Sequence, residues 1–106
     1  ETTNLVNEQS INYLPDGAVV TNAARGDIID DIAMIKAMKS GKVFALGLDV
    51  YNGEPKINPE YLKLNNLFLL PHIGSATVRT RLDMGDRAVD NLENFFNNKK
   101  PKDQVN

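Results

Sequence analysis

Three apolar runs alternate with more polar stretches along the chain. They cover Ala18–Asn22, Val43–Val50 and Leu67–Leu70. Short runs of this kind, bounded by turn residues, predict β-strands. The second run is apolar almost without interruption, which is typical of a strand covered on both faces. Polar residues follow each run, so we expect polar side chains at the end of each strand.

Helices are predicted between and after these strands by capping residues or by apolar residues at helical spacing. They cover residues 7–14, 27–40, 59–64 and 76–98. In the second helix Ile32, Ile35 and Met38 have helical spacing, and Gly41 is a natural stop. The last helix carries an apolar stripe, interrupted by Gly85, that consists of Val78, Leu82, Val89, Leu92 and Phe96.

The alternation of strands and helices predicts an α/β fold with right-handed crossovers and a parallel sheet. Three strands make a small sheet, and the predicted helices cover it poorly. No Gly-x-Gly-x-x-Gly turn follows any of the strands. We therefore interpret the chain as the second half of a doubly wound sheet with flanking helices, and we expect the first half to be absent.

Composition narrows the possible functions. The chain has 106 residues, no cysteine and one histidine, with a formal net charge of −2. These values disfavour nucleic-acid binding and exclude a disulfide framework, a thiolate metal site and a multi-histidine metal site, so we expect no metal. No apolar run approaches the roughly 20 residues of a membrane span. No signal peptide is visible, and we expect a cytoplasmic protein without membrane partners. The start, Glu1-Thr2-Thr3, reads like the middle of a longer chain.

Chemically useful side chains follow the three predicted strands. Arg25 follows the first strand, Asp49 and Glu54 lie at and beyond the end of the second, and His72 follows the third. In open α/β sheets, ligands bind at the carboxyl ends of the strands. A cation, two carboxylates and an imidazole on one edge make a plausible reaction site.

Each of these residues also has a plain structural interpretation. Arg25 could form a salt bridge with Asp27 or Asp49. Asp49 could make a strand-end hydrogen bond. Glu54 could be a solvated loop residue, and His72 could stand at a helix start, bonded to backbone.

Several short motifs together indicate a family. They are Thr3-Asn4-Leu5-Val6-Asn7, Asn22-Ala23-Ala24-Arg25-Gly26, Gly47-Leu48-Asp49-Val50, Glu54-Pro55 and Pro71-His72-Ile73-Gly74-Ser75-Ala76-Thr77. In this order and spacing the chain resembles the C-terminal part of the NAD-binding domain of D-isomer-specific 2-hydroxyacid dehydrogenases. The segment from Gly74 to Thr77, followed by Arg79 and Arg81, is most similar to glyoxylate/hydroxypyruvate reductases.

The resemblance implies a catalytic role for three residues. His72 resembles the proton donor in the reduction of a 2-oxo acid, because an imidazolium can deliver a proton near neutral pH. Glu54 resembles its carboxylate partner, which favours the imidazolium and orients the ring. Arg25 resembles the arginine that grips the substrate carboxylate with two hydrogen bonds.

The resemblance also implies contacts to an NAD or NADP cofactor. Asp49 resembles the residue that meets the nicotinamide amide, and Ala23 and Gly74 match positions that approach the cofactor. Arg25 and His72 would lie beside it as well. Ser75 matches a position that contacts substrate or cofactor.

The expected function is therefore hydride transfer between NAD(P)H and a small 2-oxo or 2-hydroxy acid, with glyoxylate or hydroxypyruvate as substrate. A phosphoglycerate dehydrogenase-like enzyme is one alternative. A non-catalytic, corepressor-like protein that senses dinucleotides on the same fold is another. The resemblance implies that residues 1–106 form a partial Rossmann-type dinucleotide-binding domain that lacks the glycine-rich half and the substrate domain. We expect this part to be inactive alone, and the complete protein to be a homodimer.

Overall fold

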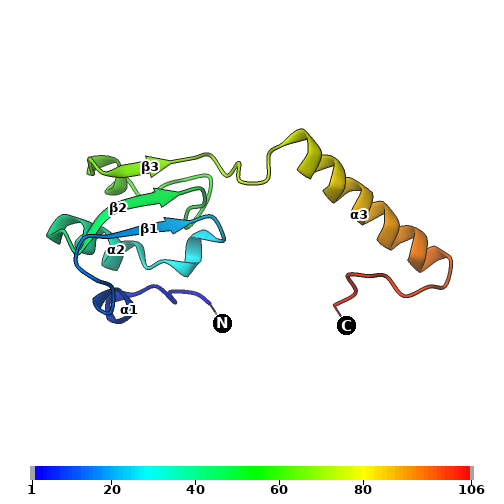
Figure 1. Cartoon of the computed structure of the whole chain (residues 1–106), viewed down its shortest axis with the longest axis horizontal. Helices are drawn as coiled ribbons and strands as arrows, with labels where there is room; N and C mark the ends of the chain where they lie inside the picture. The colour runs from blue at the N-terminus through cyan, green and yellow to red at the C-terminus, as the bar shows by residue number, and fades with distance from the viewer. Residues whose placement is uncertain (1, 106) are drawn as a thin grey trace. The chain divides into compact units, whose positions relative to one another are not determined.

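The computed structural model describes residues 2–105 and divides after Gly74 into two compact units. The first unit holds the sheet and its helices. The second holds one long helix and the segment that follows it (Figure 1). Each unit is described separately below.

The first unit is built on a three-stranded parallel sheet. Its strands are β1 (Ala18–Asn22), β2 (Val43–Leu48) and β3 (Leu67–Leu69), in the spatial order β1-β2-β3 (Figure 1). Because all three strands are parallel, their carboxyl ends lie at one edge. This confirms the predicted fold class. Strand β2 ends at Leu48, two residues before the predicted end, so that Asp49 and Val50 already belong to the loop.

Short helices precede and connect the strands. Asn7 caps α1 (Glu8–Asn12) by accepting hydrogen bonds from the backbone of Gln9 and Ser10. The helix predicted from residue 27 divides in two, a 3-10 turn η1 (Gly26–Ile28) and the helix α2 (Asp31–Ser40). Asp30 caps α2, and Gly41 ends it with a φ of 81°, a conformation that glycine adopts without strain.

The core lies between α2 and one face of the sheet. Its fully buried side chains are Met34, Val43, Leu46, Val50 and Tyr61, the last from the 3-10 turn η2 (Tyr61–Lys63). The Tyr61 hydroxyl donates to Asp31 Oδ1 at 3.0 Å and so ties η2 to the start of α2. Of the three apolar residues at helical spacing in α2, Ile35 and Met38 are buried and Ile32 is exposed.

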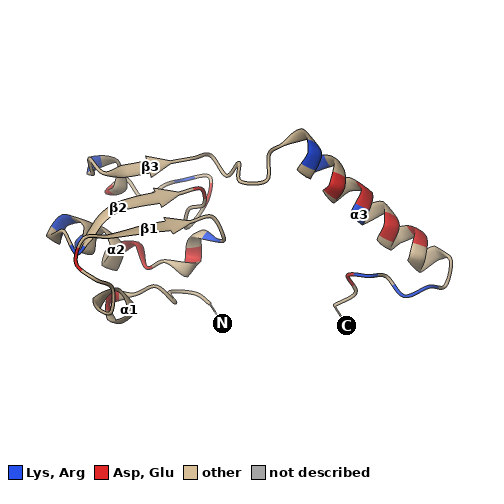
Figure 2. Ribbon diagram, viewed as in Figure 1, with Lys and Arg blue, Asp and Glu red and all other residues tan. Residues whose placement is uncertain are grey.

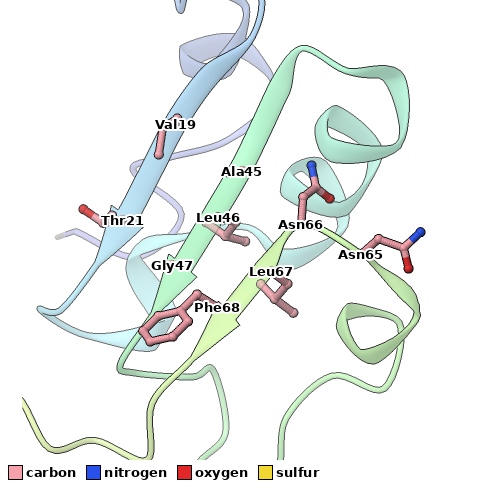
Figure 3. A pocket seen from close by; sticks show the side chains of 9 residues that line it. All are labelled: Val19, Thr21, Ala45, Leu46, Gly47, Asn65, Asn66, Leu67 and Phe68. Carbon is pink, nitrogen blue, oxygen red and sulfur yellow. The ribbon is translucent and has the colours of Figure 1, made fainter.

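The other face of the sheet is open in this unit. Val19, Phe44 and Phe68 are each about two-thirds exposed. Figure 3 shows the Phe68 ring beside Gly47, in a shallow hollow that Val19 and Thr21 also line. Along β2, Val43, Leu46 and Leu48 are buried, Ala45 and Gly47 are intermediate, and Phe44 is exposed. Within the first unit the strand is therefore covered on one face only, where the sequence predicted cover on both.

The second unit contains α3 (Val78–Phe96), capped by Thr77. The helix starts two residues later and ends two residues earlier than predicted. Its apolar stripe is exposed within this unit, and a Cβ at Gly85 would meet nothing within 4 Å. Acidic residues recur along the helix (Figure 2). After the helix, Asp103 accepts two hydrogen bonds from Arg87, at 2.6 and 2.8 Å, which ties the tail to α3.

Candidate functional site

The most distinctive pair at the carboxyl edge of the sheet is His72 and Glu54. Nδ1 of His72 lies 2.8 Å from Oε2 of Glu54, with the two side chains 49% and 33% exposed. The other carboxylate oxygen, Oε1, accepts the backbone N–H of Tyr51 at 2.8 Å. An ionised carboxylate only accepts hydrogen bonds, so Nδ1 carries the hydrogen of this contact.

The environment of Glu54 favours its charged form. The hydrogen bond with His72, followed by that from the Tyr51 backbone, lowers the pKa of the Glu54 carboxyl. A carboxyl whose pKa is depressed on folding stabilises the fold above its unfolded pKa, and this contribution is lost as the pH falls through the folded value. Glu54 is therefore not merely a solvated loop residue.

His72 lies in a loop and not at a helix start, because α3 begins six residues later. Its backbone has a φ of 55°, in the left-handed region that residues other than glycine seldom adopt. Such conformations persist only where neighbouring contacts hold them, and they cluster at functional sites. The interpretation of His72 as a helix-start residue bonded to backbone is wrong.

Asp49 supplies one of the contacts that hold this loop. Its buried carboxylate is 6% exposed and accepts the backbone N–H groups of Ile73 and Gly74, each at 2.7 Å. The strand-end hydrogen bond predicted as its plain structural role is thus present. A Cβ at Gly74 would lie 2.8 Å from Oδ2 of Asp49, so a side chain at this position would disturb the contact.

Arg25 is exposed at the end of the loop that follows β1. Its guanidinium donates to the carbonyl of Ala24 at 2.6 Å, and it pairs with neither Asp27 nor Asp49. The predicted salt bridge is therefore wrong. Asn22 shapes the loop, because its side-chain amide donates to the carbonyl of Arg25 at 2.8 Å and its side-chain oxygen accepts the N–H of Ala24 at 3.0 Å.

Three structural contributors to this edge were not predicted. Asn22 is buried, and an asparagine at a strand end that bonds its own backbone two residues on is a recognisable turn signal. Gly26 packs so closely against the backbone of Tyr51 and Asn52 that a Cβ there would overlap it. Tyr51 donates its hydroxyl hydrogen bond to the carbonyl of Leu70. No local sequence signal points to these last two contacts.

A small hollow lies at the ends of all three strands. It has a volume of about 150 Å³ and is mostly apolar, with Ala23 and Asp49 on its lining. The remaining lining residues are Thr21, Asn22, Gly47, Leu48, Phe68 and Leu70. The hollow borders the segments that carry Arg25 and His72. Ser75 belongs to the second unit, so its predicted contact stays a prediction.

A parallel sheet with polar side chains and a hollow at its carboxyl edge defines part of a nucleotide-binding α/β domain. The chain belongs to the D-isomer specific 2-hydroxyacid dehydrogenase family, whose NAD-binding domain matches residues 1–74. Beyond residue 74, similarity to individual relatives continues through the second unit.

Curated relatives support the same assignment. The chain is 44% identical over 96 residues to a glycerate dehydrogenase of Hyphomicrobium methylovorum, covering 91% of this chain and 30% of that protein. It is 41% identical over 106 residues to a glyoxylate reductase of Thermococcus kodakarensis, covering 100% of this chain and 32% of that protein. The chain thus spans about a third of the length of these relatives.

A solved structure matches both sequence and fold. It is the NADPH-dependent glyoxylate/hydroxypyruvate reductase of Sinorhizobium meliloti in complex with NADP and malonate, with a TM-score of 0.84 and 38% identity. The match covers 90% of this chain and 30% of that one. Between residues 2 and 105, no helix is long and apolar enough to cross a membrane.

Proposed function

We propose that this chain supplies the catalytic edge of an NAD(P)-dependent reductase that acts on a small 2-oxo acid, either glyoxylate or hydroxypyruvate. The observation that carries the proposal is the His72–Glu54 pair at the carboxyl edge of a family-typical sheet. The substrate class, small 2-oxo acids, is supported by the relatives that are glyoxylate or glyoxylate/hydroxypyruvate reductases.

His72 acts as the proton donor in this proposal. Addition of hydride to the carbonyl carbon places negative charge on the carbonyl oxygen, and Nε2 of the imidazolium gives that oxygen a proton to form the 2-hydroxy acid. Glu54 holds Nδ1 and balances the charge of the ring before transfer. The neutral ring then regains a proton from solvent, which its half-exposed position permits.

Arg25 holds the substrate carboxylate. Its guanidinium is exposed and is engaged only with the neighbouring carbonyl of Ala24 among the described residues. It can therefore turn toward an anionic substrate and form two parallel charge-assisted hydrogen bonds. Ser75 is proposed as a further contact to substrate or cofactor.

The 150 Å³ hollow fits the nicotinamide end of NAD or NADP, because it is mostly apolar and has one buried carboxylate on its wall. When bound, the cofactor supplies the hydride. Ala23 lines the hollow, and Arg25, His72 and Gly74 stand on its bordering segments. Asp49 already accepts two backbone hydrogen bonds, but a carboxylate has about four acceptor positions, so it can also accept from the nicotinamide amide.

We further propose that residues 1–106 work as part of a longer polypeptide, called the full-length enzyme below. The chain spans a third of its relatives and contains no Gly-x-Gly-x-x-Gly turn for the pyrophosphate. The glycine-rich half and the substrate domain would complete the site. A homodimer and a cytoplasmic location remain expectations from the sequence.

A kinetic assay of the full-length enzyme tests the proposed function. NADH and NADPH oxidation is followed with glyoxylate, hydroxypyruvate and 3-phosphohydroxypyruvate as substrates. We expect turnover with one of the first two. A preference for the phosphorylated acid would favour the phosphoglycerate dehydrogenase alternative. Cofactor binding without turnover on any 2-oxo acid would favour the corepressor-like alternative.

Replacement of Glu54 by glutamine should move the alkaline limb of the reduction rate to lower pH. Glutamine keeps the size of the side chain but removes the charge that holds the imidazolium. The pH profile of kcat with glyoxylate measures this shift in the full-length enzyme. An unchanged profile in a folded Glu54→Gln protein would refute the pairing.

Replacement of Arg25 by lysine should lower kcat/KM for the 2-oxo acid by about tenfold to a hundredfold. Lysine keeps the charge but loses one of two charge-assisted hydrogen bonds, each worth about 1.5–3 kcal/mol. Steady-state kinetics at varied substrate and varied cofactor separate the two sites. A change confined to the cofactor constant would remove Arg25 from the substrate site.

A further inference from the structure

Tyr51 contacts both segments that carry the proposed catalytic pair. Its hydroxyl donates to the carbonyl of Leu70, two residues before His72, and lies 3.3 Å from the carbonyl of Leu48 at the end of β2. Its backbone N–H donates to Oε1 of Glu54 at 2.8 Å. One residue therefore holds Glu54 through its backbone and the start of the His72 loop through its side chain.

The surroundings of Tyr51 fix its place and its protonation. Its backbone packs against Gly26, where no side chain could fit. Burial, followed by the nearby charges of Asp49 and Glu54, raises the pKa of the Tyr51 hydroxyl. The hydroxyl therefore keeps its proton throughout the neutral range and can donate a hydrogen bond to a carbonyl oxygen.

The far side of the His72 loop is held from the same segment. Asp49, two residues before Tyr51, accepts the N–H groups of Ile73 and Gly74. The loop is thus tied before and after His72, which accounts for the left-handed backbone conformation at that residue. Of these two ties, only the one from Tyr51 also reaches Glu54.

We propose that Tyr51 is a positioning residue that fixes the place of the His72 imidazole relative to the Glu54 carboxylate, acting through the Leu70 carbonyl. This proposal rests on the proposed function for its catalytic meaning. Loss of the hydroxyl frees the start of the loop, so that the imidazole spends less time within reach of Glu54. A small misplacement of a catalytic group is costly, because proton transfer requires close alignment.

The test uses the fact that His72 is the only histidine in the chain, so its imidazole signals in an NMR titration are unambiguous. Glu54 contacts the ring, Asp49 and Tyr51 contact the loop that carries it, and loop 70–74 contains no other titratable group. The titration midpoint of His72 is measured in the unaltered chain and in Tyr51→Phe, Tyr61→Phe and Glu54→Gln. Circular dichroism checks the fold of each variant.

Tyr61→Phe is the matched control, because it also removes a hydrogen-bonded tyrosine hydroxyl from the same unit but away from the pair. We expect Tyr51→Phe to move the His72 midpoint in the same direction as Glu54→Gln, by a smaller amount, and Tyr61→Phe to leave it unchanged. In the full-length enzyme, Tyr51→Phe should lower kcat about threefold to tenfold, with KM changed less than twofold. A midpoint unmoved by Tyr51→Phe, or moved equally by both tyrosine variants, would overturn the proposal.

A measurement on the unaltered chain keeps the proposal testable even if Tyr51→Phe does not fold. The hydroxyl contact predicts nuclear Overhauser effects between the Tyr51 ring and Leu70, and their absence would overturn the proposal. The NMR readout needs no catalysis. A failed activity assay would therefore refute the proposed function but not the positioning of His72 by Tyr51. A failed NMR test would refute the positioning role but not the proposed function.

Discussion

Replacement of His72 by alanine should lower the turnover of the full-length enzyme by about 10²–10⁴-fold, the usual contribution of a positioned acid. The imidazole is the proposed proton donor, and Glu54, 2.8 Å from Nδ1, cannot replace it because an ionised carboxylate only accepts hydrogen bonds. Cofactor binding should change little. Stopped-flow or steady-state oxidation of NAD(P)H with glyoxylate measures the loss.

Two controls accompany His72→Ala. Loss of the half-exposed His72–Glu54 pair should lower the unfolding temperature only slightly, because exposed ion pairs contribute little to stability, and calorimetry checks this. Glu54→Gln should retain far more activity than His72→Ala at low pH, because the ring can still be protonated there. A folded His72→Ala enzyme with turnover within threefold of the unaltered one would remove His72 from the chemistry.

Replacement of Gly26 by alanine should destabilise the first unit by about 1–3 kcal/mol, the usual cost of overpacking. The added methyl group would overlap the backbone of Tyr51 and Asn52, which has no flexible side chain to yield. Displacement of this backbone would also move the N–H that holds Glu54. Urea unfolding of the 106-residue chain measures the loss of stability.

Gly85→Ala is the matched control for Gly26→Ala. A Cβ at Gly85 would meet nothing within 4 Å, and the residue lies inside α3. Alanine is favoured over glycine in a helix by about 0.5–1 kcal/mol, so this variant should be as stable as the unaltered chain or slightly more stable. Equal stability of Gly26→Ala and the unaltered chain would contradict the packing described here.

The sheet could be predicted from the sequence because its determinants are local. Val19 and Val20 stand in an apolar run bounded by Gly17 and Asn22, and the predicted strand matches β1 at both ends. Asp30 and Gly41 bound α2 through capping and a left-handed glycine, which are also local effects. The family assignment was likewise predictable, since its motifs are short and occur in a fixed order.

The arrangement of the candidate site depends on contacts between distant segments, and these left no local signal. The Tyr51 hydroxyl reaches Leu70, 19 residues away, and Gly26 is required by the backbone of a loop 25 residues further on. The strand-end hydrogen bond predicted for Asp49 is present, because its carboxylate accepts the backbone N–H groups of Ile73 and Gly74. The apolar run of β2 predicted cover on both faces. Such a run does not show which segments pack against each face of the strand.

The most direct test of the central claim is a chimera in which this chain replaces the matching segment of the Thermococcus kodakarensis glyoxylate reductase, to which all 106 residues align. The scaffold would supply the remaining two-thirds, and this chain would supply Arg25, Glu54 and His72. NADH and NADPH oxidation with glyoxylate is then measured with and without His72→Ala. We predict sustained turnover that His72→Ala reduces by about 10²–10⁴-fold. A folded, cofactor-binding chimera without turnover, or one indifferent to His72→Ala, would contradict the assignment of the catalytic edge to this chain.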